Sequence, residues 1–310
     1  MSARLVFMGT PRFAVPTLLA LHGAGHEILG VVTQPDRRKG RGKKVAFPPV
    51  KEAALTLGLS VFQPANVNEE GFAGQLAALS PDVIVTVAFG QILKGHILGL
   101  PPRGCLNVHA SLLPKYRGAA PIAWAIYNGD SVTGVTIMMM DEGMDTGPIL
   151  AAREEHIQPD DTTESLGERL ADDGARLLVE TLEGWLAGKL DPIPQDAERA
   201  SYAPPLKKSD GKIDWRRPAM EIERQIRSMI PWPGAFTTLD GKTLKIYRAQ
   251  LAEPVEVMPP GECLVTDDTW RVATGRGALD LKEVQLAGKK RHDIRTFLKG
   301  FKPRGRLLFS

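Results

Sequence analysis

The sequence predicts an α/β domain built on a parallel sheet, followed by a small β-barrel domain. Residues 82–88 form a continuous β-branched run, as in strands that are buried on both faces. Helical patterns alternate with such runs up to residue 186, and short β-type runs recur after residue 207. We therefore expect a Rossmann-like domain at residues 1–189, a linker at 190–207 and an OB-like β-barrel domain at 208–310. A chain of 310 residues is long enough for two such domains.

The elements of the first domain follow from short apolar runs and the residues that end them. The run from Arg4 to Met8 ends at Gly9-Thr10-Pro11, which is typical of a strand entering a turn. Further strands are expected at residues 27–33, 82–88, 104–108 and 135–140, and helices at residues 13–23, 49–57, 121–127 and 162–186. Because strands alternate with helices, we expect a parallel sheet with an active site beyond the carboxyl ends of its strands.

The second half of the chain changes character after the long helix. Residues 188–206 hold four prolines and few large apolar side chains, so we expect a linker there. Short β-type runs then follow at residues 235–239, 244–247, 261–265, 270–274 and 279–284. Gly, Asp and Pro separate these runs, which predicts a small all-β unit of the barrel type.

Charge is unevenly distributed along the chain. The net charge is only +3, which gives no global signal for nucleic acid. The segment from Lys282 to Ser310, however, contains nine Lys and Arg residues and only two acidic residues. The remainder of the chain is therefore net acidic. Such asymmetry indicates an anionic partner for the basic segments.

Several protein classes are disfavoured by composition and by missing motifs. Cys105 and Cys263 are far apart in the sequence, so neither a disulfide framework nor a zinc site is expected. No signal peptide and no run of about 20 apolar residues is present, so we expect a cytoplasmic protein without a membrane partner. The turn at Gly9 lacks the Gly-x-Gly-x-x-Gly pattern of dinucleotide sites, and Ser111 lacks a Gly-x-Ser-x-Gly elbow.

The candidate site begins at Asn107-Val108-His109. These residues lie at the expected end of a strand, where side chains two positions apart point to the same side. Asn107 and His109 should therefore face one spot. An amide that can hold a carbonyl oxygen beside a proton-handling imidazole suits acyl transfer.

The stretch from Asn107 to Ile122, with Ser111-Leu112-Leu113-Pro114 and Arg117-Gly118-Ala119-Ala120-Pro121, resembles the signature of the folate-dependent formyltransferases. The resemblance runs from residue 4 to 308. It implies that Asp145, in the loop 141–147 after the strand 136–140, is the third catalytic residue. It also implies transfer of a formyl group from 10-formyltetrahydrofolate to the α-amine of initiator methionyl-tRNA, for translation initiation, without a metal. We expect a monomer.

The resemblance also implies roles for the residues around this set. Asn107 and a protonated His109 would stabilise the oxyanion that forms on the formyl oxygen. Asp145 would orient the imidazole, favour its charged form and, with a water, relay the amine proton. The residues implied to hold the folate are Phe89, Gly90, Gln91, Ile92, Leu93, Ser111, Leu112, Leu113, Pro114, Asp141 and Gly143.

Two basic regions are candidates for tRNA contact. Residues 34–44 hold six basic residues and two glycines against Asp36, which suits either a solvated loop or a loop that wraps phosphates. A β-barrel with a basic face is a common oligonucleotide platform. The expected tRNA-binding residues are Arg37, Arg38, Lys39, Arg41, Lys43, Lys44, Lys208, Lys289 and Lys290.

Two alternatives stay open. A formyltransferase that acts on a sugar-nucleotide amine or on glycinamide ribonucleotide would share Asn107, His109 and Asp145. It would not need the basic loop 34–44 or the basic C-terminal unit. An RNA-binding protein without activity on the same fold is the alternative from another class, although all three catalytic residue types are present here.

Overall fold

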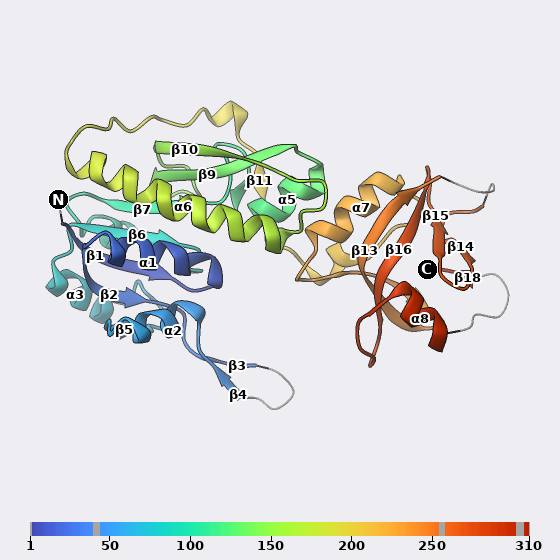
Figure 1. Cartoon of the computed structure of the whole chain (residues 1–310). Coiled ribbons are helices and arrows are strands. Elements are labelled where there is room, and N and C mark those ends of the chain that lie inside the picture. Colours follow the sequence, from blue (N-terminus) through green and yellow to red (C-terminus); the bar gives the residue numbers. More distant parts are fainter. Residues whose placement is uncertain (1, 40–43, 254–257, 302–306, 310) are drawn as a thin grey trace. The chain divides into compact units, whose positions relative to one another are not determined.

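The computed structural model describes residues 2–39, 44–253, 258–301 and 307–309 (Figure 1). The chain divides into two compact units. Unit 1 comprises Met1–Pro121, Val132–His156 and Gly167–Ala203, and unit 2 comprises Ile122–Ser131, Ile157–Leu166 and Pro204–Ser310. The segment that the sequence suggested as a linker therefore belongs largely to unit 1, up to Ala203.

Unit 1 is built on a seven-stranded sheet with the order β10-β9-β7-β6-β1-β2-β5. The strands are β1 (Arg4–Gly9), β2 (Glu27–Val32), β5 (Val61–Phe62), β6 (Val83–Val87), β7 (Cys105–His109), β9 (Val132–Met139) and β10 (Ile149–His156). The five strands from β5 to β7 run parallel, which confirms the Rossmann-like class. β6 is buried along its whole length, as its β-branched run predicts.

β9 differs from the expectation of an all-parallel sheet. It runs antiparallel to β7, and β10 runs antiparallel to β9. The loop after β9 therefore starts beside the first residue of β7, where the Met140 N–H donates to the Cys105 carbonyl. We expected the carboxyl ends of β7 and β9 to lie at the same edge of the sheet. This expectation is wrong, because the antiparallel β9 ends beside the start of β7. The loop after β9 therefore folds back along the sheet to reach His109.

Helices cover the sheet of unit 1. They are α1 (Val15–Gly23), α2 (Pro49–Thr56), α3 (Glu70–Leu79), α4 (Gly95–Leu98) and α6 (Thr163–Leu186). Leu76 of α3 and Ile97 of α4 join Val6, Met8 and Ile84 in one buried cluster on one face of the sheet. Sequence patterning anticipated α1, α2 and α6 within about two residues. It did not anticipate α3, α4 or the two-residue strand β5.

A hairpin extends from the end of β2. Its strands are β3 (Arg37–Lys39) and β4 (Lys44–Ala46), which pair antiparallel (Figure 1). Asp36 lies at its root, where the carboxylate accepts hydrogen bonds from Lys51 and Gln63 at 2.7 and 2.8 Å. These bonds lower the pKa of Asp36 below its ordinary value. The basic segment is thus tied to α2 through an ion pair.

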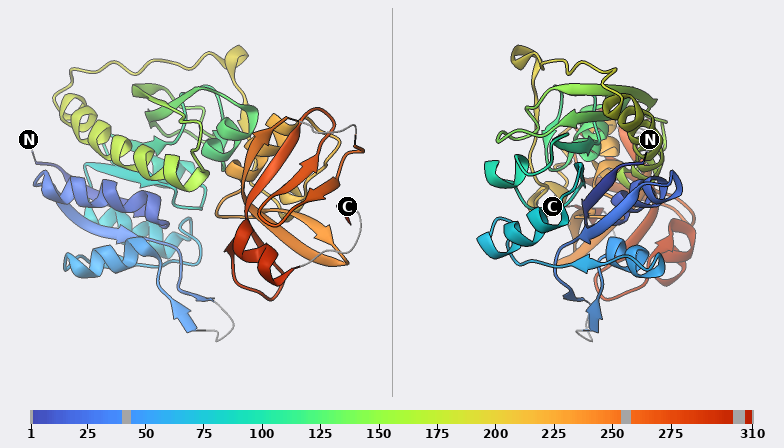
Figure 2. Two further views of the ribbon diagram at one scale, coloured as in Figure 1. Left: turned by 45° about the vertical axis from the view of Figure 1, so that its right-hand side comes forward. Right: turned by 90° about the vertical axis from the view of Figure 1, so that its left-hand side faces the viewer.

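Unit 2 contains a curled antiparallel sheet (Figure 2). Its strand order is β12-β13-β16-β15-β14-β18, and β17 pairs with β16. The strands are β12 (Ala235–Leu239), β13 (Lys242–Ala252), β14 (Glu262–Val265), β15 (Trp270–Ala273), β16 (Ala278–Leu286), β17 (His292–Asp293) and β18 (Leu307–Leu308). Register shifts between Ile246 and Ala249 let β13 bend around the core. These strands confirm the antiparallel β unit.

The expectation of an all-β unit is wrong, because two helices complete its core. They are α7 (Ala219–Ser228) and α8 (Ile294–Gly300), and unit 2 also contains most of α5 (Pro121–Asn128). Ile222 and Ile226 of α7 and Phe297 of α8 join the buried cluster around Trp270. Across the described ranges, no helix is long and apolar enough to cross a membrane.

Candidate active site

Strand β7 presents Asn107 and His109 on one face of the sheet. Both side chains are largely buried, at 9% and 5% exposure. Val108 points to the opposite face, where α6 comes so close that a Cβ on Gly174 would lie 2.7 Å from the Val108 side chain. Among the described residues the Asn107 amide makes no hydrogen bond. Strand alternation thus gathers the amide and the imidazole, as the sequence predicts.

The imidazole of His109 lies between two acceptors. Its Nε2 is 2.9 Å from the Tyr116 carbonyl oxygen, and its Nδ1 is 3.7 Å from Oδ2 of Asp145. A carbonyl oxygen only accepts, so Nε2 carries a hydrogen. Nδ1 is then the nitrogen that lies on the side of Asp145. The ring is thereby oriented between a backbone carbonyl and a carboxylate.

The loop between β9 and β10 brings Asp145 to this place. Asp141 closes the loop by accepting hydrogen bonds from the Gly143 N–H at 3.0 Å and the Thr146 hydroxyl at 2.7 Å. Asp145 has a left-handed backbone with φ of 53°. Its Oδ2 accepts a hydrogen bond of 2.8 Å from the Gly118 N–H. Asp145 is therefore fixed by the segment that also supplies the Tyr116 carbonyl.

Three contributors to this geometry were missed by the sequence reasoning. Tyr116 and Gly118 lie inside the motif, but backbone groups leave no residue-type signal. Gln195 lies 50 positions after Asp145, and its Nε2 donates to the carbonyls of Asp145 and Gly147 at 2.9 and 2.7 Å. No pattern in its proline-rich surroundings marks it.

Most of the candidate folate residues lie in two loops of unit 1, after β6 and after β7. In these two loops, the side chains of two candidate residues already form hydrogen bonds inside the protein. Gln91 accepts from the Val67 N–H at 2.7 Å, and Ser111 is fully buried and donates to the Lys115 carbonyl at 2.6 Å. Ile92, in contrast, is 73% exposed. Gln91 and Ser111 shape the loops, whereas Ile92 can contact a ligand.

A cavity of about 540 Å³ opens at the carboxyl ends of β1, β2 and β6. Its lining residues are Thr10, Pro11, Gln34, Pro35, Arg37, Ala46, Phe47, Pro48, Ala88, Phe89 and Gly90. The Thr10 hydroxyl donates to the Phe89 carbonyl at 2.8 Å and so joins two of these strand ends. The cavity brings together Phe89 and Gly90, expected to hold folate, and Arg37, expected to contact tRNA.

The candidate tRNA-binding residues that the structure describes lie in three places. Arg37, Arg38, Lys39 and Lys44 lie on the β3–β4 hairpin, whereas Arg41 and Lys43 lie outside the described residues. Lys289 and Lys290 are exposed after β16. Lys208 begins a short 3-10 helix, Lys208–Gly211, in unit 2. Of these residues, Arg37, Lys208, Lys289 and Lys290 are exposed.

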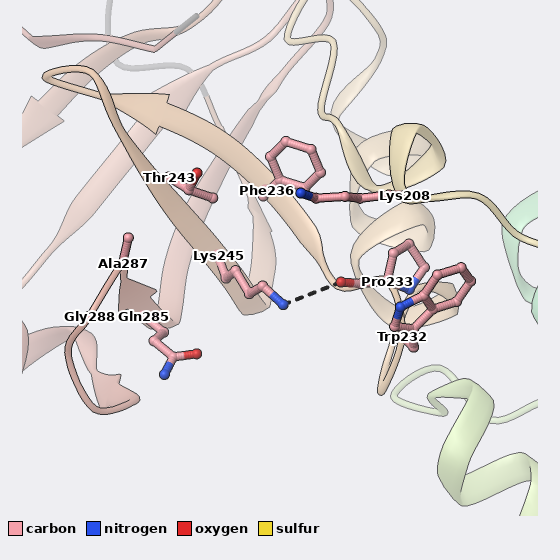
Figure 3. Close-up of a pocket in the computed structure, with 9 residues that line it drawn as sticks. All are labelled: Lys208, Trp232, Pro233, Phe236, Thr243, Lys245, Gln285, Ala287 and Gly288. Carbon is pink, nitrogen blue, oxygen red and sulfur yellow. Dashed lines mark hydrogen bonds between the residues drawn. The ribbon is translucent and has the colours of Figure 1, made fainter. Parts of the chain in front are cut away.

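Lys208 lines a second cavity, of about 570 Å³, in unit 2 (Figure 3). Its lining residues are Lys208, Trp232, Pro233, Phe236, Thr243, Lys245, Gln285, Ala287 and Gly288. Trp232 is 56% exposed, and Lys245 donates to the Pro233 carbonyl at 3.3 Å. In the described part of the chain neither lysine forms an ion pair. The sequence indicated Lys208 for tRNA contact but neither Trp232 nor Lys245, which line the same cavity.

A Rossmann-like sheet that presents an amide, an imidazole and a carboxylate together, followed by a curled β unit, defines a class of acyl-transferring enzymes. The chain belongs to the formyl transferase family. The family model described as "Formyl transferase" matches residues 3–182, and "Formyl transferase, C-terminal domain" matches residues 205–302. The resemblance drawn from the sequence is thereby confirmed.

Relatives cover nearly the whole chain. A protein named methionyl-tRNA formyltransferase from Agathobacter rectalis is 50% identical over 299 residues, 96% of each chain. Its namesake from Caldanaerobacter subterraneus subsp. tengcongensis is 50% identical over 307 residues, 98% of this chain and 99% of its own. Another from Pelobacter propionicus is 51% identical over 302 residues, 97% of this chain and 94% of its own.

Solved structures of lower identity share the fold. HypX from Aquifex aeolicus in complex with tetrahydrofolic acid aligns with a TM-score of 0.68 at 17% identity, covering 100% of this chain and 51% of its own. The sugar 3N-formyl transferase WlaRD aligns with a TM-score of 0.68 at 19% identity, covering 94% and 100%. A glycinamide ribonucleotide transformylase from Symbiobacterium toebii aligns with a TM-score of 0.52 at 21% identity, covering 63% and 95%.

Proposed function

We propose that this protein transfers the formyl group of 10-formyltetrahydrofolate to the α-amine of initiator methionyl-tRNA. The observation that carries the proposal is the placement of His109 between the Tyr116 carbonyl and Asp145, on the strand that also carries Asn107, whose amide makes no hydrogen bond among the described residues. The relatives of about 50% identity named methionyl-tRNA formyltransferase support the acceptor. The sugar and glycinamide ribonucleotide enzymes resemble the chain only at the level of the fold.

The reaction places negative charge on the formyl oxygen when the uncharged amine attacks the formyl carbon. Asn107 Nδ2 is one donor available to that oxygen. Nε2 of His109 is occupied by the Tyr116 carbonyl, whereas its Nδ1 lies 3.7 Å from Oδ2 of Asp145, beyond hydrogen-bond distance, so Nδ1 is the second available donor. One such donor typically contributes about 3 kcal/mol to the transition state. The carboxylate of Asp145 lies beside this nitrogen.

The proton that leaves the amine must reach N10 of the folate. Oδ2 of Asp145 is held by Gly118, whereas its Oδ1 has no partner among the described residues. We propose that Oδ1, with a bound water, accepts this proton and passes it on. Positioning of two large substrates supplies much of the remaining barrier reduction.

The two units divide the remaining work. In our proposal residues 1–189 carry the chemistry and the folate, in the loops 89–93 and 111–114 and in the Asp141–Gly143 turn. Residues 208–310, joined through 190–207, contribute tRNA contact. The exposed Trp232 with Lys208 and Lys245 supports this role, because an aromatic face beside cations suits an unpaired base and its phosphate. The β3–β4 hairpin is the proposed second contact.

A formyl-transfer assay with radiolabelled donor tests the proposal. The full chain is offered charged initiator tRNA, glycinamide ribonucleotide or an amino-sugar nucleotide. We expect label on the tRNA alone. Label on a small amine with none on tRNA would favour the sugar-nucleotide or glycinamide alternative, and RNA binding without any transfer would favour a protein that has lost catalysis.

A further inference from the structure

We propose that Gln195 is a positioning residue for formyl transfer, and that residues 193–203 act as a strap which holds His109 and Asp145 in register. The proposal rests on the proposed function, since it concerns the same site. The sequence suggested only a linker here. All contacts that follow lie within unit 1.

Gln195 joins the two loops that flank the imidazole. Its Nε2 donates to the carbonyls of Asp145 and Gly147, at 2.9 and 2.7 Å. Its Oε1 accepts from Nε and Nη2 of Arg117, at 3.0 and 2.7 Å. Arg117 is 4% exposed, so this amide is the partner of a nearly buried guanidinium. All four hydrogen bonds of Gln195 therefore connect Arg117 to the Asp145 loop.

The rest of the strap fixes the neighbouring loop through its backbone. Ile193 and Ile149 exchange two hydrogen bonds of 2.8 Å. β11 (Tyr202–Ala203) pairs in parallel with β8 (Arg117–Gly118). The Tyr116 N–H donates to the Ser201 hydroxyl at 2.9 Å. Thus one eleven-residue range, 193–203, contacts the start of β10, the Asp145 loop and the Tyr116–Gly118 segment.

Backbone strain explains why such a strap is needed. Tyr116 has φ of 60° and Asp145 has φ of 53°, a region that residues other than glycine rarely adopt. Such residues persist where the surroundings hold them, and they cluster at active sites. Here Tyr116 supplies the carbonyl that orients His109, and Asp145 supplies the carboxylate. Both strained residues are hydrogen-bonded by the strap, through Ser201 and Gln195 respectively.

The test compares Gln195→Glu with the wild-type chain. Glutamate keeps an acceptor for Arg117 but loses both N–H donors, and its charge repels the two carbonyls. We expect kcat for formyl transfer to fall about 10- to 100-fold, because small misplacements of reacting groups have effects of this size. KM for tRNA should change little. The matched control is Gln75→Glu, an exposed residue of α3, which should leave kcat and KM unchanged.

A second readout does not depend on transfer to tRNA. The ¹⁵N imidazole resonances of His109, assigned with His109→Ala, should move in Gln195→Glu at constant pH and stay in place in Gln75→Glu. Unchanged resonances together with kcat within about twofold of wild type would overturn the proposal. Gln195→Met, which removes donors and acceptor at similar size, should give the same direction. If the wild-type chain fails to formylate tRNA, the proposed function fails, whereas the resonances still decide the role of Gln195.

Discussion

At the scale of single residues, the chemistry depends on which nitrogen of His109 faces the substrate. The Tyr116 carbonyl holds Nε2 at 2.9 Å, so the substrate-facing nitrogen is Nδ1. Nδ1 lies 3.7 Å from Oδ2 of Asp145, beyond hydrogen-bond distance, so it stays available to a substrate oxygen. The fold thus orients one ring nitrogen through a backbone carbonyl and leaves the other for the proposed reaction.

The Asn107→Ala variant tests the oxyanion role most cleanly. The amide has no hydrogen bond among the described residues, so its loss should hardly change the free energy of unfolding. We expect kcat to fall about 10² or more, as for loss of one oxyanion donor. His109→Ala should lose at least as much activity but also a buried hydrogen bond worth about 1 kcal/mol. Near-wild-type turnover in both variants would contradict the mechanism.

Asp145→Asn separates charge from shape. The asparagine Oδ1 can still accept from the Gly118 N–H, so the loop should keep its place. The variant lacks the negative charge that lies 3.7 Å from Nδ1 of His109. We expect kcat to fall by about 10² or more while folate affinity stays within about twofold, measured by turnover and by ligand titration. Full activity would reduce Asp145 to a turn residue.

His26 provides a prediction on stability and pH. Burial lowers the pKa of His26 below its ordinary value of 6.5, and the Ala3 N–H donates to its Nδ1 at 3.2 Å. The unfolded chain then binds this proton more readily, so the free energy of unfolding should decline as pH falls below about 6.5. Denaturant melts between pH 7.5 and 5.5 should show a smaller decline in His26→Asn, which does not titrate. Equal slopes would contradict this role.

Sequence patterns identified the candidate catalytic residues but not the groups that hold them in place. Asn107 and His109 could be predicted because side chains two positions apart on a strand point to the same side. Asp145 could be predicted because its loop matches a family motif. Gln195 could not be predicted, since it hydrogen-bonds to backbone carbonyls that lie 48 and 50 positions away in the sequence. The Tyr116 carbonyl carries no signal in a residue name. Positioning by the backbone can be found only once the fold is known.

At the scale of elements, hydrophobic periodicity predicted positions better than directions. β9 is buried along most of its length, and its apolar run has the same pattern in a parallel or an antiparallel strand. Its direction depends on the pairing with β7, which is a long-range property. α7 was missed because its three apolar core contacts are embedded in ten mostly charged or polar residues. Short amphipathic helices in a β-rich stretch are poorly marked by composition.

Gly118 combines a positive φ with a close approach to the backbone of β11. Its φ is 118°, and a Cβ there would lie 2.7 Å from the Ala203 carbonyl oxygen. Gly118→Ala should therefore push β11 from β8, destabilise the protein by about 1–3 kcal/mol and lower kcat through the lost Asp145 contact. Gly74→Ala in α3 is the control, since its added methyl meets nothing within 4 Å. Helix propensity predicts that the control is neutral or stabilised by up to about 1 kcal/mol.

Denaturant titration and turnover of the two glycine variants check this prediction. An unchanged kcat in Gly118→Ala, with the stability loss present, would show that the β8–β11 pairing supports the fold without positioning Asp145. Loss of both would agree with the strap proposed for residues 193–203.

At the scale of the whole molecule, the chain combines a small net charge with local basic clusters. The net charge of +3 would give a weak overall attraction to RNA. The candidate contacts are instead concentrated on the β3–β4 hairpin and around the cavity with Lys208, Trp232 and Lys245. Asp36 and Lys51 form an ion pair at the root of the hairpin. In our proposal, tRNA binding and catalysis therefore depend on different residues.

This separation predicts how salt should affect the protein. Each phosphate contact lowers the logarithm of affinity with a slope of about −0.7 to −0.9 against the logarithm of salt concentration. Neutralising Arg41, Lys43 and Lys44 should weaken tRNA binding and flatten the slope. Neutralising Lys208 and Lys245 should do the same for the cavity of unit 2. Lys289→Gln with Lys290→Gln should have a milder effect, and the exposed Lys189→Gln is the control.

Filter-binding titrations between about 50 and 200 mM salt measure these slopes, a range over which several phosphate contacts change affinity by orders of magnitude. Transfer to a small amine, where it can be measured, should be unaffected by these charge-neutralising substitutions. In the proposed mechanism Asn107, His109 and Asp145 act in the same way on every formyl acceptor. A tRNA instead needs separate contacts for its phosphates, and those contacts are what salt screens. If tRNA affinity and its salt slope stayed unchanged with the hairpin and cavity lysines neutralised together, the tRNA acceptor would be excluded and a sugar-nucleotide amine would become the better assignment.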